Sequence, residues 1–204
     1  TSITPADIKY ARELGYVIKL LAIAKEDEEG RIQARVHPAF LPLNHPLAVV
    51  NDVFNAVFVR GDAVGEIMHF GRGAGKMPTA SAVVGDIIEI GRNLLSQSNA
   101  RIGCTCYESK TILGIQELQA KYYVRMTVED RPGVLAGIAG VFGNNRVSIA
   151  TVLQKTSEAG MAELILITHK VREQDLRDSL TDLKGMSIVG AINNVIRLEG
   201  SEAE

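Results

Sequence analysis

The order of strand and helix patterns over residues 121–198 constrains the fold more strongly than any other feature of the sequence. Strand-like stretches alternate with stretches whose leucine, isoleucine or phenylalanine residues recur at helical spacing. The predicted strands are 122–128, 147–155, 161–169 and 187–198, and the helices between them carry Leu135, Ile138, Phe142, Leu176, Leu180 and Leu183. This βαββαβ order is typical of the split, ferredoxin-like fold, whose small sheet has helices on one face and leaves an edge or a face for a partner copy.

The turn before the first helix of this region is a candidate ligand site. Residues 130–133 form the turn, and the backbone N–H groups after Gly133 open a helix whose dipole favours a carboxylate. Asn144 or Asn145, near the entry to the next strand, would be able to bond the polar groups of an amino acid. The alternative is a helix N-terminus that simply needs a tight turn, and the residue pattern leaves both interpretations open.

Residues 1–99 form an earlier region with its own pattern of elements. Thr4 as an N-cap, Pro5 at the first helical position and Asp7 in the first turn predict a helix. Strand-like runs follow at 16–25, 31–36, 53–60 and 63–70. The first run is so continuously apolar that we expect cover on both of its faces, and Gly61-Asp62 is expected to be a two-residue hairpin turn. Together these patterns predict a mostly antiparallel sheet with helices on one side, an α+β layer.

A glycine run at 71–75 lies between the last of these strands and a well-patterned helix. That helix has an apolar face made of Ala80, Val83, Val84, Ile87 and Leu94. The glycines would let the backbone approach a phosphate or a ribose closely. The spacing does not match a Walker A loop, because Phe70 stands at the first glycine position and Met77 follows the lysine, and it does not match the Rossmann fingerprint. Tight strand-to-helix packing and ligand contact both remain open.

Composition and charge exclude several classes of function. The net charge is -2 with a pI near 6.1, aromatic residues make up 5% and tryptophan is absent, so neither phosphate-backbone binding nor base stacking is expected. Charged residues interrupt every apolar stretch well before the roughly 20 residues that a bilayer span needs. No secretory leader opens the chain. We therefore expect a cytoplasmic protein with no membrane or nucleic-acid partner, processed or trimmed because it begins with threonine.

Few residue patterns in the sequence indicate a metal site or a catalytic site. Cys104 and Cys106 form a C-x-C pair, which rarely meets disulfide geometry and lacks two further ligands for zinc, so ordinary reduced thiols are expected. The histidines are scattered along the chain at positions 37, 45, 69 and 169, so we expect no metal site. No nucleophile elbow or Cys/His dyad occurs.

Two motifs nevertheless carry a specific family resemblance. The first is Glu129-Asp130-Arg131-Pro132-Gly133-Val134-Leu135 which, with Asn144-Asn145 and the βαββαβ order, resembles an ACT domain, a small regulatory module that binds amino acids, usually at a dimer interface. The second is the stretch 71–86, which resembles the last helix region of homoserine dehydrogenase, as do 10–22 and 45–51. The resemblance covers nearly the whole chain and divides it into a partial catalytic and dimerisation domain at 1–99, a linker at 100–120 and an ACT domain at 121–200.

The resemblance implies roles for a limited set of residues. Gly75 matches a glycine that contacts the nicotinamide cofactor, and Thr79 lies one helical turn further on. The implied effector-binding residues are Asp130, Arg131, Pro132, Gly133, Val134, Leu135, Asn144 and Asn145. Neither the Rossmann glycines nor the Asp-x-x-Gly-x-Asp-x-x-x-Lys pattern of the family occurs, so no catalytic side chain is expected in this chain, and NAD(P) would be held mainly by a domain that it lacks.

The resemblance also implies a function for the parent protein. It would interconvert L-homoserine and L-aspartate 4-semialdehyde with NAD(P), on the route to threonine and methionine. It would be a dimer or tetramer under feedback regulation by an amino acid, with threonine as the expected effector. We expect this chain alone to be inactive. Two alternatives are a non-enzymatic amino-acid sensor, with the first region as its output domain, and an ACT domain that only stabilises assembly.

Overall fold

The computed structural model describes residues 2–98, 107–156 and 160–200, and it divides the chain into two compact units. Unit 1 combines Thr1–Leu43 with Lys110–Glu204, and unit 2 is Asn44–Ser109. The predicted region 1–99 therefore contributes to both units. Its first 43 residues fold with the C-terminal region, although more than 60 residues separate them along the chain. Each unit is described by itself.

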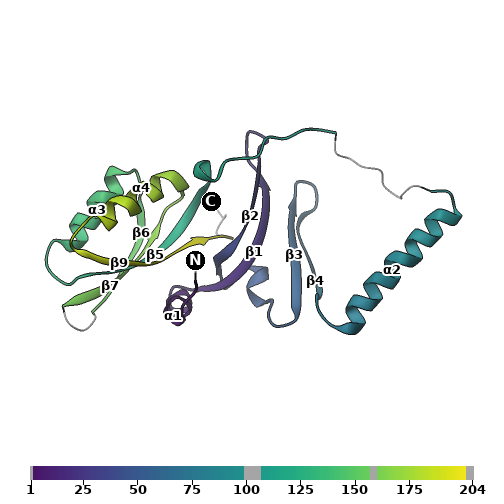
Figure 1. Ribbon diagram of the computed structural model, residues 1–204, viewed down its shortest axis with the longest axis horizontal. Coiled ribbons are helices and arrows are strands. Elements are labelled where there is room, and N and C mark those ends of the chain that lie inside the picture. Colours follow the sequence, from purple (N-terminus) through teal and green to yellow (C-terminus); the bar gives the residue numbers. More distant parts are fainter. Residues whose placement is uncertain (1, 99–106, 157–159, 201–204) are drawn as a thin grey trace. The chain divides into compact units, whose positions relative to one another are not determined.

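Unit 1 contains the predicted βαββαβ order. It runs through β5 (Gln119–Glu129), α3 (Val134–Asn144), β6 (Ile149–Thr156), β7 (Met161–Thr168), α4 (Glu173–Lys184) and β9 (Val189–Leu198), with a short β8 (Val171–Arg172) beside the start of β5. We call the strands β9-β5-β7-β6, in that spatial order, the ACT sheet. Both α3 and α4 lie on one face of this sheet (Figure 1). The predicted α+β class and ferredoxin-like order are confirmed.

Alternating residues of the strands build the core beneath the two helices. The inward residues of β5 are Tyr122, Val124, Met126 and Val128, and they meet Val134, Ile138 and Phe142 of α3 and Leu176 and Leu183 of α4. The helical spacing predicted from sequence is therefore the spacing that is buried. The residue in the left-handed conformation after α3 is Arg146 (φ 61°). The Val147 N–H donates to the Phe142 carbonyl across it (2.8 Å).

The first residues of the chain complete the other side of this sheet. Helix α1 (Pro5–Glu13) begins after the predicted N-cap Thr4, and Asp7 completes a capping box with it. Strands β1 (Tyr16–Glu26) and β2 (Ile32–Pro42) pair in antiparallel register, and β2 adds to β9 in parallel at Ala39 and Phe40. A second core forms here, in which Tyr10, Ala11 and Phe40 pack on Tyr123, Ile165, Ile167, Ile196 and Leu198.

Two expectations for this hairpin are wrong. β2 does not stop at residue 36 but runs through Pro38 to Pro42. The Leu43 N–H points to β1, where it meets the Gly15 carbonyl, whereas the Phe40 carbonyl faces Glu199 on the other side. Successive residues of a strand direct their N–H groups to opposite sides, so positions 38, 40 and 42 all face away from β1. The prolines at 38 and 42 therefore remove no hydrogen bond between β1 and β2. The strand at 16–25 is also not covered on both faces, because Leu20 is 73% exposed.

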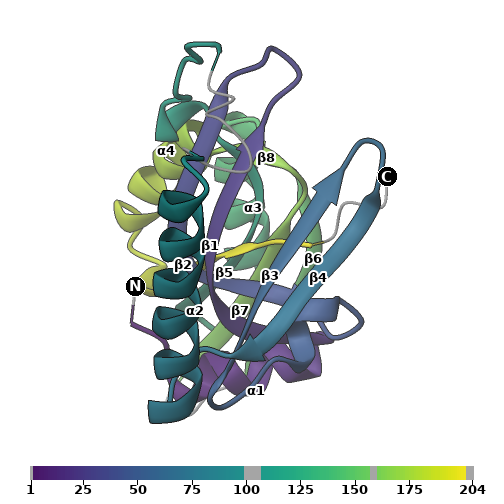
Figure 2. The ribbon, with the colours of Figure 1, turned by 90° about the vertical axis from the view of Figure 1, so that its right-hand side faces the viewer.

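Unit 2 is a hairpin followed by a long helix, with a 3-10 turn, η1 (Pro46–Val49), before them. Strands β3 (Phe54–Gly61) and β4 (Gly65–Arg72) pair in antiparallel register, and α2 (Lys76–Leu95) follows (Figure 2). The predicted two-residue turn is wrong: residues 62–64 form the loop, and Gly65 (φ 72°) adopts the left-handed conformation that closes such three-residue connections. Every residue of α2 is described, and none is buried.

The predicted linker is only partly described. Cys104 and Cys106 lie outside the described residues. Residues 107–120 contain a bridge between Ile112 and Ile32, followed by the 3-10 turn η2 (Ile115–Glu117). In the described part of the chain, no helix has the length and hydropathy of a membrane span.

Candidate functional site

The first candidate site is the loop between β5 and α3, which we call the effector loop, residues 130–135. Its shape comes from Gly133, whose φ of 90° is left-handed and strained for any residue with a Cβ. The Asp130 N–H donates to the Gly160 carbonyl at the start of β7 (2.9 Å), which ties the loop to the sheet. Asp130, Pro132 and Gly133 are exposed, whereas Val134 is buried in the core.

The chemistry of this loop suits a small anion. The N–H groups of Leu135 and Ala136 belong to the first turn of α3 and have no helical carbonyl to bond. Arg131 brings a guanidinium to the same loop, where it pairs with Glu129 (Nε to Oε2, 2.5 Å) at an exposed position. A carboxylate near this turn would meet both the helix dipole and a positive charge, while Asp130 would attract an amino group.

The structure does not bring the two predicted asparagines to this loop within one chain. Asn144 is the last residue of α3 and Asn145 caps it, and the 11 residues of α3 span roughly 16 Å. The Asn145 amide donates to the Val141 carbonyl (3.0 Å) and to Asp182 of α4 (2.8 Å). One small ligand therefore touches both ends only if a second copy supplies one of them.

Sequence reasoning missed one neighbour of the effector loop. Gln154 of β6 donates from its amide nitrogen to the Asp130 carboxylate (3.2 Å). Both groups are exposed, so a ligand amino group could replace the amide at that carboxylate. No spacing in the sequence points to Gln154, because β6 and the loop meet only through the pairing of β6 with β7.

The second candidate site is the turn between β4 and α2, and the predicted strand–turn–helix is present. Gly75 has φ 130° and ψ 149°, and a Cβ there would lie 3.3 Å from Pro78. At Gly73 a Cβ would collide with the Asn55 side chain (1.5 Å), so this glycine serves packing within the hairpin. Packing thus accounts for Gly73, and ligand contact at Gly75 stays a prediction. Gly75 and Thr79 are exposed, and the Thr79 N–H donates to the Gly75 carbonyl (3.1 Å).

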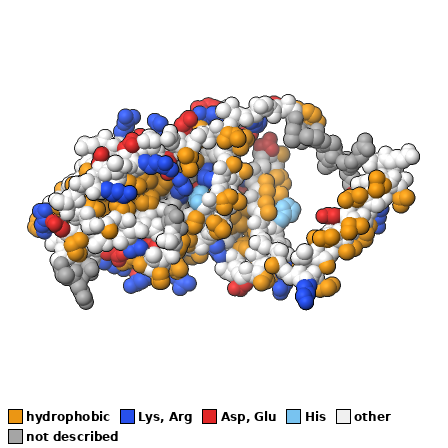
Figure 3. Space-filling view, viewed as in Figure 1, with side chains coloured by type: hydrophobic (Ala, Val, Ile, Leu, Met, Phe, Trp, Pro, Cys, Tyr) orange, Lys and Arg blue, Asp and Glu red, His pale blue; other side chains and the backbone are white. Residues whose placement is uncertain are grey.

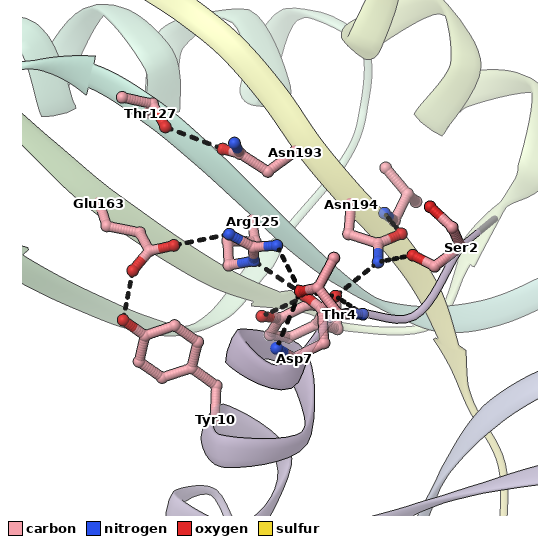
Figure 4. Close-up of polar contacts among 11 residues, drawn as sticks. Ser2, Thr4, Asp7, Tyr10, Arg125, Thr127, Glu163, Asn193 and Asn194 are labelled. Carbon is pink, nitrogen blue, oxygen red and sulfur yellow. Dashed lines mark hydrogen bonds and ion pairs between the residues drawn. The ribbon is translucent and has the colours of Figure 1, made fainter.

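A buried polar network lies on the face of the ACT sheet opposite α3 and α4 (Figure 4). No sequence pattern predicted it. Asp7 of α1 is fully buried and accepts from the Arg125 Nε (2.8 Å), the Asn194 amide (2.7 Å) and the Thr4 hydroxyl (2.7 Å). The Arg125 Nη1 also pairs with Glu163 (2.7 Å). Burial raises the pKa of Asp7, but the bonds from Arg125, Thr4 and Asn194 outweigh it and hold that pKa below its ordinary value.

A second buried carboxylate lies at the start of α4. Glu173 accepts from the Tyr122 hydroxyl (2.6 Å) and pairs with Arg197 (2.6 Å) and Arg177 (2.9 Å). Burial again raises its pKa, and the hydrogen bonds from Tyr122 and the two arginines bring it below the ordinary value. Every oxygen of Glu173 is therefore engaged, and the cluster joins α4 to β5 and β9 rather than facing a ligand.

The histidines do not form a metal site among the described residues. His37 and His45 both have pKa values lowered by burial, one in each unit. Among the described residues, no group of three histidine, cysteine, aspartate or glutamate side chains has an arrangement that could hold a metal ion.

Comparison with family models adds two matches. Residues 1–88 match the model described as homoserine dehydrogenase, and residues 122–186 match the ACT domain. The effector loop falls inside the second match and the Gly75 turn inside the first. Helix α1 and Arg125 therefore belong to different family segments, although they share one buried network.

Several relatives match nearly the whole chain. A homoserine dehydrogenase of Corynebacterium glutamicum is 44% identical over 98% of this chain and 45% of that protein, and one of Synechocystis is 41% identical over 97% and 47%. The crystal structure of a homoserine dehydrogenase from Thiobacillus denitrificans superimposes with a TM-score of 0.87 at 36% identity, over 97% of this chain and 46% of that one. The chain thus spans just under half the length of the relatives it matches.

Proposed function

We propose, from the premise that this chain belongs to the homoserine dehydrogenase family, that it forms part of an enzyme that interconverts L-homoserine and L-aspartate 4-semialdehyde with NAD(P). The observation that carries the proposal is the match over 97% of the chain to a homoserine dehydrogenase structure at a TM-score of 0.87. In this proposal, unit 2 belongs to the substrate and cofactor region, and the ACT sheet with α3 and α4 is the regulatory region of a cytoplasmic protein in threonine and methionine synthesis.

The turn at Gly75 fits a cofactor contact. Gly75 has no side chain to shield its backbone from a ligand. The N–H groups of Lys76 and Met77 belong to the first turn of α2 and have no helical carbonyl partners. Such a helix start suits a carboxamide or phosphate oxygen. NAD(P), when bound, supplies the hydride acceptor. The contribution of Gly75 and Thr79 is to orient its nicotinamide end, while the rest of the cofactor is held by parts of the enzyme outside this chain.

The activity has a direct test. The 204-residue chain alone is expected to show no homoserine-dependent reduction of NADP, because no catalytic carboxylate or lysine was assigned to it. A longer protein that contains this chain is expected to show that reaction, and Gly75→Val in it should lower kcat. Gly85→Val in α2, where a Cβ meets nothing within 4 Å, is the matched control. Turnover by the 204-residue chain would contradict the assignment.

The effector of the ACT region, in this proposal, is an amino acid, and we take threonine as the first candidate. Its carboxylate would bind at the start of α3 near Arg131, and its amino group would bind Asp130. Calorimetric titration of the chain with threonine is expected to give saturable binding. Gly133→Val should weaken it, because the left-handed φ of 90° is lost. Gly65→Val, at φ 72° in the other unit, imposes similar strain outside the loop and should leave binding unchanged.

The ACT region also limits where a second copy binds. Strand β9 is paired by β2, and the sheet face opposite α3 and α4 is covered by α1. Among the described strands, none pairs with the outer edge of β6. We therefore place the homo-oligomer contact at that edge, where a second copy would bring its asparagines 144 and 145 toward the effector loop of the first. Val152→Asp on β6 is expected to lower the molecular mass measured by light scattering.

One observation favours a second function. The sequence lacks the catalytic motif of the family, whereas its ACT region has every element of the βαββαβ order. A non-enzymatic amino-acid sensor is therefore the alternative to the enzyme. The coding sequence before Thr1 discriminates the two: a Rossmann motif and a catalytic lysine there support the enzyme, and a start codon at that point supports the sensor. If the ACT region only stabilises assembly, no amino acid in a panel will raise the thermal midpoint.

A further inference from the structure

Helix α1 is attached to every strand of the ACT sheet. Asp7 near its start meets Asn194 of β9 and Arg125 of β5, and Tyr10 in its middle donates from its hydroxyl to Glu163 of β7. At its last residue, Glu13 pairs with Lys155 of β6. These contacts follow the helix from end to end, so any relative shift of two strands changes the geometry at α1.

Arg125 and Asp7 are the centre of this attachment. The guanidinium of Arg125 bonds at once to Asp7, to Glu163 (Nη1 to Oε1, 2.7 Å) and to the Thr4 hydroxyl (Nη2 to Oγ1, 3.1 Å). Asp7 is 0% exposed and Arg125 is 7% exposed. Buried ionic hydrogen bonds of this kind hold only at good geometry, because the desolvated charges gain nothing from water when a bond is stretched. The docking of α1 is therefore sensitive to small movements of β5 and β7.

The strands that hold α1 also hold the effector loop. Asp130 follows directly after β5, five residues beyond Arg125. The carbonyl that receives the Asp130 N–H belongs to Gly160, three residues before Glu163. On β6, Gln154 contacts Asp130 and its neighbour Lys155 contacts Glu13, on opposite faces of the strand. The loop and α1 thus share β5, β7 and β6 over a separation of roughly 15 Å along a strand.

Strand β9 adds an irregularity at the same place. The register of β5 with β9 shifts between Arg125 and Met126 and again between Thr127 and Val128, between the network and the effector loop. The first shift leaves Asn193 as the extra residue, and its side chain accepts from the Thr127 hydroxyl (3.0 Å). Asn194, next to the bulge, is the residue that donates to Asp7. Bulges re-aim side chains and make a ladder locally adjustable.

We propose that Asp7 and Arg125 are positioning residues that couple the effector loop to helix α1. Ligand binding that orders the loop changes the spacing of β5 and β7, and the network transmits this change to α1, which belongs to the segment that matches homoserine dehydrogenase. This inference rests on the proposed effector function. It assigns the transmission of the signal to a buried ion pair between the two family segments, not to the connecting residues 89–121.

The test measures amide hydrogen exchange in α1 of the 204-residue chain, with and without saturating threonine, while calorimetry follows threonine binding. In the wild type, threonine is expected to slow α1 exchange by at least about threefold. In Arg125→Met, threonine binding should persist while the slowing in α1 is lost. The control is Arg60→Met in unit 2. It removes an exposed arginine–glutamate pair whose N–O distance (2.7 Å) equals that of Arg125–Glu163, and it should leave both readouts unchanged.

A milder variant covers the case in which Arg125→Met does not fold. Arg125→Lys keeps the charge but loses the planar fork that bonds Asp7, Glu163 and Thr4 together. It is expected to reduce the slowing of α1 exchange rather than abolish it. If either variant binds threonine and slows α1 exchange as fully as the wild type, the network does not transmit the signal and the inference is overturned.

A measurement without ligand separates this inference from the proposed function. Absence of threonine binding in the wild type would refute the effector assignment alone. Gly133→Val then perturbs the loop directly: it should speed α1 exchange in the wild-type background and have a clearly smaller effect beside Arg125→Lys. Equal effects in the two backgrounds would overturn the coupling, whatever the loop binds.

Discussion

The two units of this chain use their apolar residues in different ways. In unit 1, both faces of the ACT sheet are buried, one under α3 and α4 and the other under α1. In unit 2, the 20 residues of α2 include valines, isoleucines and leucines at helical spacing, yet none of them is buried. Figure 3 shows these hydrophobic side chains along the surface of α2. The same sequence pattern therefore gives a core in one unit and an open surface in the other.

The difference shows what amphipathic patterning does and does not determine. A helical apolar stripe selects the helix and the face that will be buried, but it does not supply the opposing surface. Unit 1 contains its own opposing surfaces, although one of them comes from the far end of the sequence. The chain spans just under half the length of the relatives it matches, and among the described residues nothing buries the apolar face of α2.

The largest expected effect compares a core residue with its counterpart in the open helix. Phe142 of α3 is fully buried, so Phe142→Ala should destabilise unit 1 by about 3–5 kcal/mol through lost burial and a cavity. Ile87 of α2 is 62% exposed, and Ile87→Ala should change stability by less than about 0.5 kcal/mol. Urea unfolding followed by far-UV circular dichroism measures both. A similar cost at the two positions would mean that α2 is buried in solution, for example by a second copy.

The next effect compares ion pairs in the two units. Arg125→Met leaves Asp7 as a buried, unpaired carboxylate and should cost about 3 kcal/mol. Arg60→Met removes the exposed pair with Glu66 and should cost less than about 1 kcal/mol. The free energy of unfolding in urea measures the two costs. Equal costs would show that Asp7 is not desolvated, and would also weaken the case for a coupling network.

The smallest effect concerns pH. The folded pKa of Asp7 lies below its ordinary value of 3.8, so the unfolded chain binds this proton at a higher pH than the folded chain does. The stability that Asp7 contributes is therefore complete above about pH 4–5, and it is lost as the pH falls through 3.8 toward the folded pKa. Acid titration of unfolding free energy should be steeper for the wild type than for Asp7→Asn. Identical slopes would contradict the lowered pKa.

Much of the local structure was predictable. The capping box of Thr4 and Asp7, the βαββαβ order and the stripe of Ile138 and Phe142 all follow from contacts between neighbours in sequence. The errors arose where tertiary context overrode local signals. The predicted strand ended at residue 36, whereas β2 continues through Pro38 and Pro42, because their missing N–H groups point away from β1.

The candidate sites divide in the same way. Gly133 and Gly75 were predictable, because a positive φ at a helix start selects glycine locally. Gln154 beside Asp130 was not, and Asp7 was predicted only as an acidic residue in the first helical turn. Its second role depends on Arg125, 118 residues away, and on Asn194, 187 residues away. No periodicity connects such distant positions in a single sequence.

The main helices and strands, their order and the glycines at both turns are readable from the sequence, because these depend on backbone sterics and on side chains within a few residues. Folding in three dimensions places the first 43 residues on the ACT sheet, and it makes Asp7, the capping-box partner of the N-cap Thr4, the centre of a buried ion network. The cause is desolvation. With only its sequence neighbours as partners, the Asp7 carboxylate would cap a helix in water. It can be buried as a charge because the distant strand β5 supplies Arg125, whose pairing offsets the loss of hydration.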